Sequence, residues 1–311
     1  MRFPALVLIP MLAIPSARAH RAPVQPAPPG GAADSVIVST AWLASHLHDP
    51  DLVVLQVNMA MMNDAPFTAG HIPGAHVLPY ESIAVDKNGL GSEMPSLDSL
   101  RAAFEAAGVS DRSHVVIYYP SEAPSAARAV MALDYLGHDR VSFLDGGLPK
   151  WRAEGRPIET TAAPVARGTL HAQPRESVIA TAPWIQSRIG KPGIALIDTR
   201  TDGEYLGTAH RHGMPSEGHL AGARQLQWQQ LFQGDSGSAH GEPLKSRAEL
   251  AKLYADRMQP GDTVVTYCWV GYRASTTYLA ARSLGLPVKL YDGSYEDWAR
   301  RKLPLRTGAT P

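Results

Sequence analysis

Residues 263–284 read TVVTYCWVGYRASTTYLAARSL and contain the clearest strand-to-helix transition in the chain. The β-branched and aromatic run 262–267 is typical of a buried strand. A short loop with one glycine follows, and the residues 274–284 then favour a helix that Gly285 and Pro287 would end. The order of strand, short loop and helix predicts an α/β unit in which Cys268 lies at the carboxyl end of a strand.

The same alternation of strands and helices extends over the rest of the chain. In the second half, Ser246 with Glu249 three residues later predicts a capped helix over 246–257. Alternating strands and helices predict a mainly parallel sheet with helices on both faces. The other predicted elements are strands 194–198 and 288–291 in the second half, and strands 52–57, 115–119 and 141–144 with helix 125–136 in the first half.

Three sequence motifs occur twice, in the same order, at offsets of 148, 149 and 147 residues. This spacing is far longer than the period of solenoid repeats and indicates a duplicated domain. We predict a first domain at 34–160, a linker rich in proline and alanine at 161–176 and a second domain at 177–311. The motifs are GHIPGAH at 70–76 and GHLAGAR at 218–224, VVIYY at 115–119 and VVTYC at 264–268, and DGG at 145–147 before Trp151 and DGS at 292–294 before Trp298.

The amino terminus has the features of an export signal. Arg2 precedes the apolar stretch 3–14, and the sequence Ala17-Arg18-Ala19 then has the small-x-small pattern of a cleavage site. The alternative is an uncleaved membrane anchor, but the apolar stretch is too short to cross a bilayer as a helix. We predict a signal peptide at 1–19 cleaved after Ala19, a flexible leader at 20–33, a periplasmic or secreted protein, and no integral membrane segment after cleavage.

Composition narrows the classes of partner. The 311 residues include 29 basic and 29 acidic side chains, so the formal net charge is zero. Nucleic acids and anionic membranes call for clustered positive charge, and we therefore expect small-molecule partners and no nucleic acid. We expect a monomer, because two domains already bury a surface against each other.

Cys268 is the only cysteine in the chain, so it cannot form an intrachain disulfide. A helix N-terminus after its loop would offer unpaired N–H groups that favour an anion such as a thiolate or a persulfide. Gly271 would let the loop amides converge, and Arg273 would add positive charge. The alternative is a buried, inert cysteine, but the combined context of strand, loop, arginine and helix favours a reactive thiol.

The sequence resembles the rhodanese family of sulfurtransferases. The loop 268–273 matches that family's Cys-x-x-Gly-x-Arg pattern, and the paired motifs above, Asp198-Thr199-Arg200 and Glu204-Tyr205 match it too. The resemblance covers about 35–305 and implies two tandem α/β domains, of which only the second is catalytic. In the first domain Tyr119 stands in place of the cysteine, and we expect that domain to shape the cleft.

The resemblance also implies a mechanism. The Cys268 thiolate would take a sulfur atom from a donor such as thiosulfate, and a thiophile such as cyanide or a thiol would then remove it from the persulfide. No metal or organic cofactor is expected. The loop residues would bind the anionic substrate and three more side chains would support the loop; the former are Trp269, Val270, Gly271, Tyr272 and Arg273, and the latter are Asp198, Arg200 and Glu204.

Departures from the family pattern leave the donor open between thiosulfate and 3-mercaptopyruvate. Val270 and Glu204 stand where thiosulfate-selective members carry cations, and Trp269 and Tyr272 predict a more aromatic cleft mouth. The segment 207–213 contains residues that could supply positive charge. A non-turnover persulfide carrier is one alternative. A cysteine phosphatase is another, but its loop has five residues between cysteine and arginine, and the loop here has four.

Overall fold

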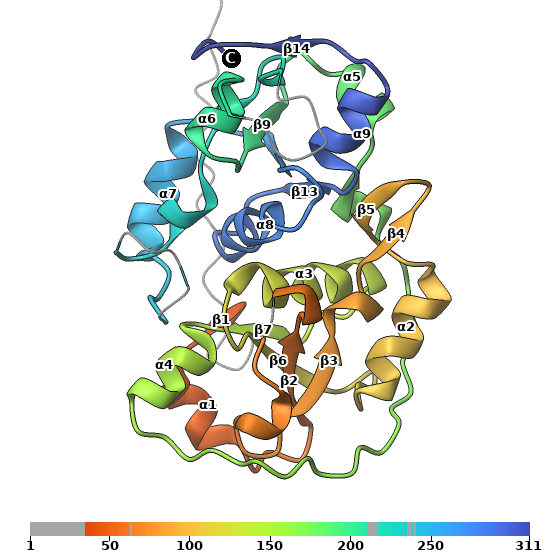
Figure 1. The fold of residues 1–311 in the computed structure, drawn as a ribbon, viewed down its shortest axis with the longest axis vertical. Coiled ribbons are helices and arrows are strands. Elements are labelled where there is room, and N and C mark those ends of the chain that lie inside the picture. Colours follow the sequence, from red (N-terminus) through yellow and green to blue (C-terminus); the bar gives the residue numbers. More distant parts are fainter. Residues whose placement is uncertain (1–34, 63, 210–216, 235–237, 239–240) are drawn as a thin grey trace, which may run out of the picture.

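The computed structural model describes residues 35–62, 64–209, 217–234, 238 and 241–311. Figure 1 shows two domains, each built around a sheet, with the first in red to yellow-green and the second in green to blue. The predicted signal peptide at 1–19, the leader at 20–33 and positions 210–213 of the segment 207–213 lie outside the described residues. Within the described ranges, no helix combines the length and apolar character needed to span a membrane.

The first domain contains a five-stranded sheet, a two-stranded hairpin and four helices within the described residues. Its elements are β1 (Ile37–Val38), α1 (Thr40–His46), β2 (Leu52–Asn58), β3 (His76–Pro79), β4 (Val85–Lys87), β5 (Leu90–Glu93), α2 (Leu97–Ala106), β6 (His114–Tyr118), α3 (Ala123–Leu136), β7 (Val141–Leu144) and α4 (Gly147–Ala153).

The second domain repeats this plan. Its elements are β8 (Ile179–Ala180), α5 (Ala182–Gln186), β9 (Ile194–Asp198), α6 (Asp202–Leu206), β10 (His219–Leu220), β11 (Arg224–Gln225), α7 (Arg247–Ala255), β12 (Thr263–Tyr267), α8 (Ala274–Ser283), β13 (Val288–Tyr291), α9 (Ser294–Arg300) and β14 (Leu305–Arg306).

The two five-stranded sheets have the same topology. The strand order is β1-β7-β6-β2-β3 in the first and β8-β13-β12-β9-β11 in the second, and every pairing within them is parallel. The α/β fold and the duplication predicted from the sequence are therefore confirmed. Among the starts of the predicted helices, that of α3 differs most, since α3 begins at Ala123 rather than at 125. Proline is tolerated in the first turn of a helix, where its missing N–H has no intrahelical acceptor, so Pro124 starts this helix instead of preceding it.

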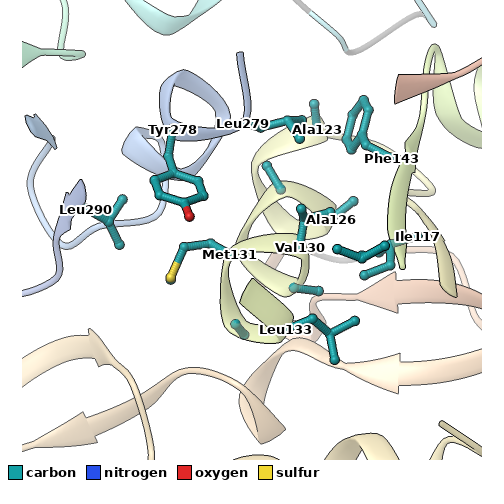
Figure 2. Close-up of a cluster of buried hydrophobic side chains, with 14 of the residues drawn as sticks. Ile117, Ala123, Ala126, Val130, Met131, Leu133, Phe143, Tyr278, Leu279 and Leu290 are labelled. Carbon is teal, nitrogen blue, oxygen red and sulfur yellow. The ribbon is translucent and has the colours of Figure 1, made fainter. Parts of the chain in front are cut away.

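The domains pack through α3 and α8, which lie side by side at the centre of the molecule in Figure 1. Buried side chains from both domains form one continuous apolar cluster there, and Figure 2 shows Met131 of α3 beside Tyr278 and Leu290 of the second domain. Asp134 of α3 accepts a hydrogen bond from Tyr278 Oη at 3.1 Å and pairs with Arg282 Nε at 2.7 Å. The second domain therefore does not sit on a mobile tether but shares a core with the first.

The β4–β5 hairpin of the first domain also reaches the second domain, beside α9 (Figure 1). The backbone N–H of Gly91 donates to Glu296 Oε2 at 3.1 Å, and that of Met94 donates to Asp292 Oδ2 at 2.8 Å. These contacts fix the hairpin at one side of the cleft that separates the carboxyl ends of the two sheets.

Candidate active site

Cys268 directly follows β12, at the carboxyl end of the central strand of the second sheet. Its N–H donates to Ser294 Oγ at 3.2 Å, and its carbonyl accepts from the N–H of Tyr295 at 3.0 Å. Ser294 adopts a left-handed conformation with φ of 53°, which a non-glycine residue rarely holds without a tertiary reason. Here that reason is the hydroxyl, which anchors the start of the loop that carries the thiol.

The loop then turns through Gly271 into α8. Gly271 has φ of 78°, and its carbonyl accepts from Ser275 Oγ at 2.9 Å in the first turn of the helix. Cys268 therefore lies at the start of the short loop that leads into the N-terminus of a ten-residue helix, where the helix dipole favours negative charge. The sequence predicted this order of strand, loop and helix. It also predicted unpaired N–H groups at the helix start, but those of Ser275 and Thr276 donate to the carbonyls of Tyr272 and Arg273 at 3.2 Å.

Cys268 opens onto a cavity of about 1020 Å³ between the two domains. Both domains form its walls, as the sequence predicted for the first domain. From the first domain the cavity is lined by Met59, Met62, Tyr80, Glu81, Ala84, Val85, Asp86, Gly91, Ser92 and Glu122; from the second by Thr201, Glu204, Trp228, Gln229, Cys268, Val270, Tyr272 and Arg273.

Trp269 corrects the prediction of an aromatic mouth built from Trp269 and Tyr272. The indole of Trp269 is fully buried behind the loop, edge-on to Tyr295 with ring centroids 4.6 Å apart, and its Nε1 donates to Glu204. An indole buries a large apolar area when it packs into a core, and the core of the second domain offers that space. Tyr272 does face the cavity. Its ring lies edge-on to that of Tyr80 of the first domain, with ring centroids 5.5 Å apart.

Arg273 is engaged by Glu204, a residue that the sequence assigned a supporting role. The guanidinium donates to both carboxylate oxygens at 2.8 Å in a bidentate pair. Burial raises the pKa of Glu204, but the hydrogen bonds and charge of Arg273, together with the N–H of Thr201 and the indole of Trp269, lower it to about 2. Arg273 therefore reaches the cavity with its charge already balanced.

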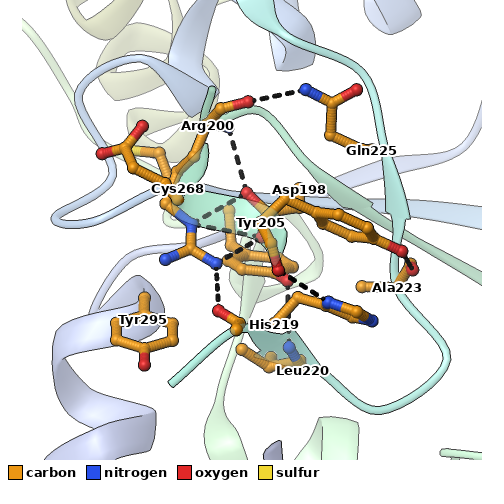
Figure 3. A network of polar contacts seen from close by, with 12 residues as sticks. Asp198, Arg200, Tyr205, His219, Leu220, Ala223, Gln225, Cys268 and Tyr295 are labelled. Atoms are coloured by element: carbon orange, nitrogen blue, oxygen red, sulfur yellow. Dashed lines mark hydrogen bonds and ion pairs between the residues drawn. The ribbon is translucent and has the colours of Figure 1, made fainter. Parts of the chain in front are cut away.

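Asp198 and Arg200 are fully buried and do not line the cavity. Figure 3 shows the contacts between their side chains. Arg200 Nη2 contacts Asp198 Oδ2 at 2.6 Å and donates to the carbonyl of Gly218 at 2.7 Å. Its guanidinium carbon also lies 5.0 Å from the ring centroid of Trp269 and 4.2 Å from that of Tyr295. Asp198 and Arg200 therefore form a buried ion pair that braces the loop through Trp269, which agrees with the supporting role expected of both residues.

The repeated glycine-histidine motifs serve structure. His219 is buried, stacks on Tyr205 with centroids 3.8 Å apart, and bonds the carbonyl of Tyr205 through Nδ1 at 2.9 Å. His71 stacks in the same way on Phe67 at 3.7 Å. Across the described part of the chain, no group of three or more His, Cys, Asp or Glu side chains is placed to hold a metal ion.

The equivalent position in the first domain is filled. Tyr119 is fully buried, and a Cβ added to Gly147 would lie 2.8 Å from its ring. In the second domain Ser294 stands at the position that corresponds to Gly147. The side chain of Cys268 is smaller than that of Tyr119 and leaves room for it. Ser238 Oγ of the second domain accepts from the N–H of Ala123, at the start of α3. In the first domain, the N-terminus of α3 corresponds to the helix terminus that lies near Cys268 in the second domain. It is covered by Ser238 of the second domain.

Sequence reasoning missed one basic side chain behind the loop. Arg128 of α3 is fully buried; its Nη1 lies 2.5 Å from Asp292 Oδ1 and 3.2 Å from the place where a Cβ on Gly271 would sit. Arg128 also donates to the carbonyl of Ser92 at 2.9 Å. An arginine in an alanine-rich helix gives no sign of this role, because its partners lie more than 150 residues away or in a hairpin. The only sequence signal near this contact is that its partner, Asp292, belongs to one of the repeated motifs.

Comparison with known proteins supports the interpretation of this site. The sequence pattern of the rhodanese-like domain matches residues 39–154 and 181–301. The chain is 31% identical to a probable 3-mercaptopyruvate sulfurtransferase of Pseudomonas aeruginosa, covering 88% of this chain and 98% of that protein. It is 29% identical to a thiosulfate sulfurtransferase of the same organism, covering 85% and 93%. The crystal structure of SseA from Escherichia coli, described as a 3-mercaptopyruvate sulfotransferase, superposes with a TM-score of 0.70 at 25% identity, covering 84% and 99%.

Proposed function

The chain belongs to the rhodanese-like family and is a sulfurtransferase, and from this premise we propose that Cys268 carries the transferred sulfur as a persulfide. The observation that carries the proposal is the position of Cys268 at the N-terminus of α8, on the wall of the interdomain cavity. A thiolate is the reactive form of cysteine, and a helix N-terminus stabilises it.

The reaction proceeds in two displacements. In the first, Cys268 Sγ attacks the outer sulfur of the donor; a new S–S bond forms, and the bond to the rest of the donor breaks with its electron pair on the leaving group, which is sulfite when the donor is thiosulfate. In the second, a thiophile attacks the terminal sulfur, and the electron pair of the broken bond returns to Sγ. A covalent intermediate divides one difficult transfer into two easier ones.

The loop residues have distinct roles in this scheme. Val270, Gly271 and Tyr272 connect Cys268 to the start of α8, and in this scheme their backbone amides stabilise the charge on thiolate and persulfide alike. Arg273, held by Glu204, keeps the start of α8 in place. Asp198 and Arg200 hold Trp269 and thus the near side of the loop.

The donor is thiosulfate or 3-mercaptopyruvate, the substrates in the names of the two relatives. Intact-mass spectrometry decides between them and tests the proposal. Incubation with the productive donor should add one sulfur atom to the wild-type protein, and cyanide should remove it. Cys268→Ser should fold normally and gain no sulfur. Thiocyanate production by Cys268→Ser at the rate of the wild type would refute the role of this residue.

We also propose that the protein is exported, with cleavage after Ala19, and acts as a monomer in the periplasm or outside the cell. The basis is the sequence of the first 19 residues, with Arg2, an apolar stretch and Ala17-Arg18-Ala19. Mass spectrometry of the protein from the periplasmic fraction should find His20 at the amino terminus, and light scattering should give the monomer mass. A full-length protein retained in the cytoplasm would contradict the proposal.

A further inference from the structure

The walls of the cavity at Cys268 carry unbalanced charge. Among the described lining residues, four carboxylates accompany a single guanidinium, that of Arg273. Arg273 is neutralised by Glu204 through two contacts of 2.8 Å. The other three carboxylates, Glu81, Asp86 and Glu122, all come from the first domain and give that wall a net negative charge.

One of these carboxylates, that of Glu81, is fixed in place at the mouth by a hydrogen bond. Glu81 Oε1 accepts from the N–H of Ala60 at 3.0 Å. Glu122 is half-buried just before α3 and does not cap that helix with its side chain. Burial and the charge of Asp64 raise the pKa of its carboxyl, and the charge of Arg273 lowers it. Arg128 does not offset this charge, because its guanidinium lies behind Gly271 against Asp292.

The remaining lining is largely apolar. Met59, Ala84 and Val85 of the first domain face Trp228 and Val270 of the second across a space of about 1020 Å³. Pockets of this size and character suit organic molecules of many atoms. Cyanide or thiosulfate would occupy a small part of this space, so it has room for a larger acceptor, and the net negative charge of the first-domain wall favours an acceptor that carries a positive charge.

We propose that the acceptor that removes sulfur from Cys268 is an organic thiol that carries a positive charge. Its cationic group lies against Glu122, Glu81 and Asp86, its apolar part contacts the walls, and its sulfur reaches the persulfide. In this step the acceptor thiolate forms a bond to the terminal sulfur, the bond from that sulfur to Sγ breaks, and Sγ keeps the electron pair. No oxidant or reductant enters. The inference rests on the persulfide chemistry proposed above.

Three small thiols that differ in charge test the selectivity: cysteamine, 2-mercaptoethanol and 3-mercaptopropionate. The full-length protein is first converted to the persulfide and checked by mass, and single-turnover sulfur loss is then followed with each thiol. Because the thiols differ in intrinsic reactivity, the readout is the ratio of the cysteamine and 3-mercaptopropionate rate constants in each variant. At low ionic strength this ratio should fall by about tenfold in Glu81→Gln/Glu122→Gln, and added salt should reduce it in the wild type.

Asp51→Asn is the matched control for the loss of a negative charge. Asp51 is exposed and precedes β2, at the opposite end of the sheet from the cavity, so the ratio should remain that of the wild type. Asp86→Asn, at an exposed position, provides a second cavity variant if the double variant unfolds. A persulfide that forms normally but shows the same ratio in wild-type and cavity variants overturns the inference alone. Failure to form any persulfide overturns the proposed function, and the inference with it.

Discussion

Arg128 and Asp292 form a buried ion pair across the domain interface, with Nη1 and Oδ1 2.5 Å apart. Arg128 belongs to the helix that would serve the missing thiol of the first domain, and Asp292 belongs to the motif that positions Ser294 and, through it, Cys268. The side chain of Arg128 is fully buried, and Asp292 accepts a second bond from the hairpin at Met94. The domain without a cysteine therefore supports the catalytic loop of the other.

Arg128→Leu should destabilise the protein strongly, because it leaves the Asp292 carboxylate buried without its counter-charge. Removal of one partner of a buried ion pair costs about 3–5 kcal/mol. Urea unfolding at neutral pH measures the difference. Arg128→Leu/Asp292→Asn should recover part of the loss, since no unpaired charge then remains.

Lys252→Ala serves as the control for that measurement. Lys252 pairs with Asp256 on the surface of α7, and exposed pairs at this spacing contribute about 0.3–0.5 kcal/mol. Equal losses of stability in Arg128→Leu and Lys252→Ala would show that the ion pair between the domains contributes no more to the free energy of unfolding than a surface pair does.

The Glu204–Arg273 pair should make stability depend on acid pH. The pKa of Glu204 is lowered from 4.5 to about 2 in the folded protein, so protons bind more readily to the unfolded chain. Its stabilisation is therefore fully present above pH 4.5 and declines as the pH falls toward 2. The difference in free energy of unfolding between wild type and Glu204→Gln should shrink over that interval. A difference that stays constant from pH 5 to pH 2.5 would contradict the pairing.

Asp134 should produce the opposite dependence. Burial raises its pKa from 3.8 to about 6, although Arg282 and Tyr278 partly counter this effect. The folded protein therefore holds a proton that the unfolded chain has released, and the stabilisation present below pH 3.8 is lost as the pH rises through 6. Relative to Asp134→Asn, the wild type should lose stability between pH 4 and pH 7 in thermal unfolding. If the stabilities of wild type and Asp134→Asn changed with pH in the same way, Asp134 would not titrate in this range at the α3–α8 contact.

Local patterns were enough to predict the inner strands of both five-stranded sheets, the helices α3, α7 and α8, the duplication and the position of Cys268, because each depends on residues close together in the chain. The short edge strands and the other helices were not predicted. Ser246 and Glu249, for example, form the predicted capping box. The orientation of Trp269 and the role of Arg128 depend on packing between distant segments, which no local pattern contains. The sequence also predicted an unbalanced positive charge at Arg273. Its partner Glu204 lies 69 residues earlier, so no local pattern could indicate that the two residues form a pair.

Gly271→Ala should slow persulfide formation strongly, with only a modest loss of stability. Gly271 has φ of 78°, and an added Cβ would lie 3.0 Å from the carbonyl oxygen of Asp292 and 3.2 Å from Arg128, so the loop must shift away from both. Gly285 has the same φ of 78° but has no neighbour within 4 Å of an added Cβ, so Gly285→Ala reports the left-handed strain alone, about 1–2 kcal/mol.

Thermal unfolding and the rate of sulfur uptake, measured on both variants, separate the effect of backbone strain from that of a displaced loop. Because a shifted loop would no longer hold Cys268 and the neighbouring amides in their places, uptake should fall at least about a hundredfold in Gly271→Ala and stay near wild type in Gly285→Ala. Similar uptake in the two variants would mean that the path of the loop past Asp292 is not what prepares Cys268 for transfer.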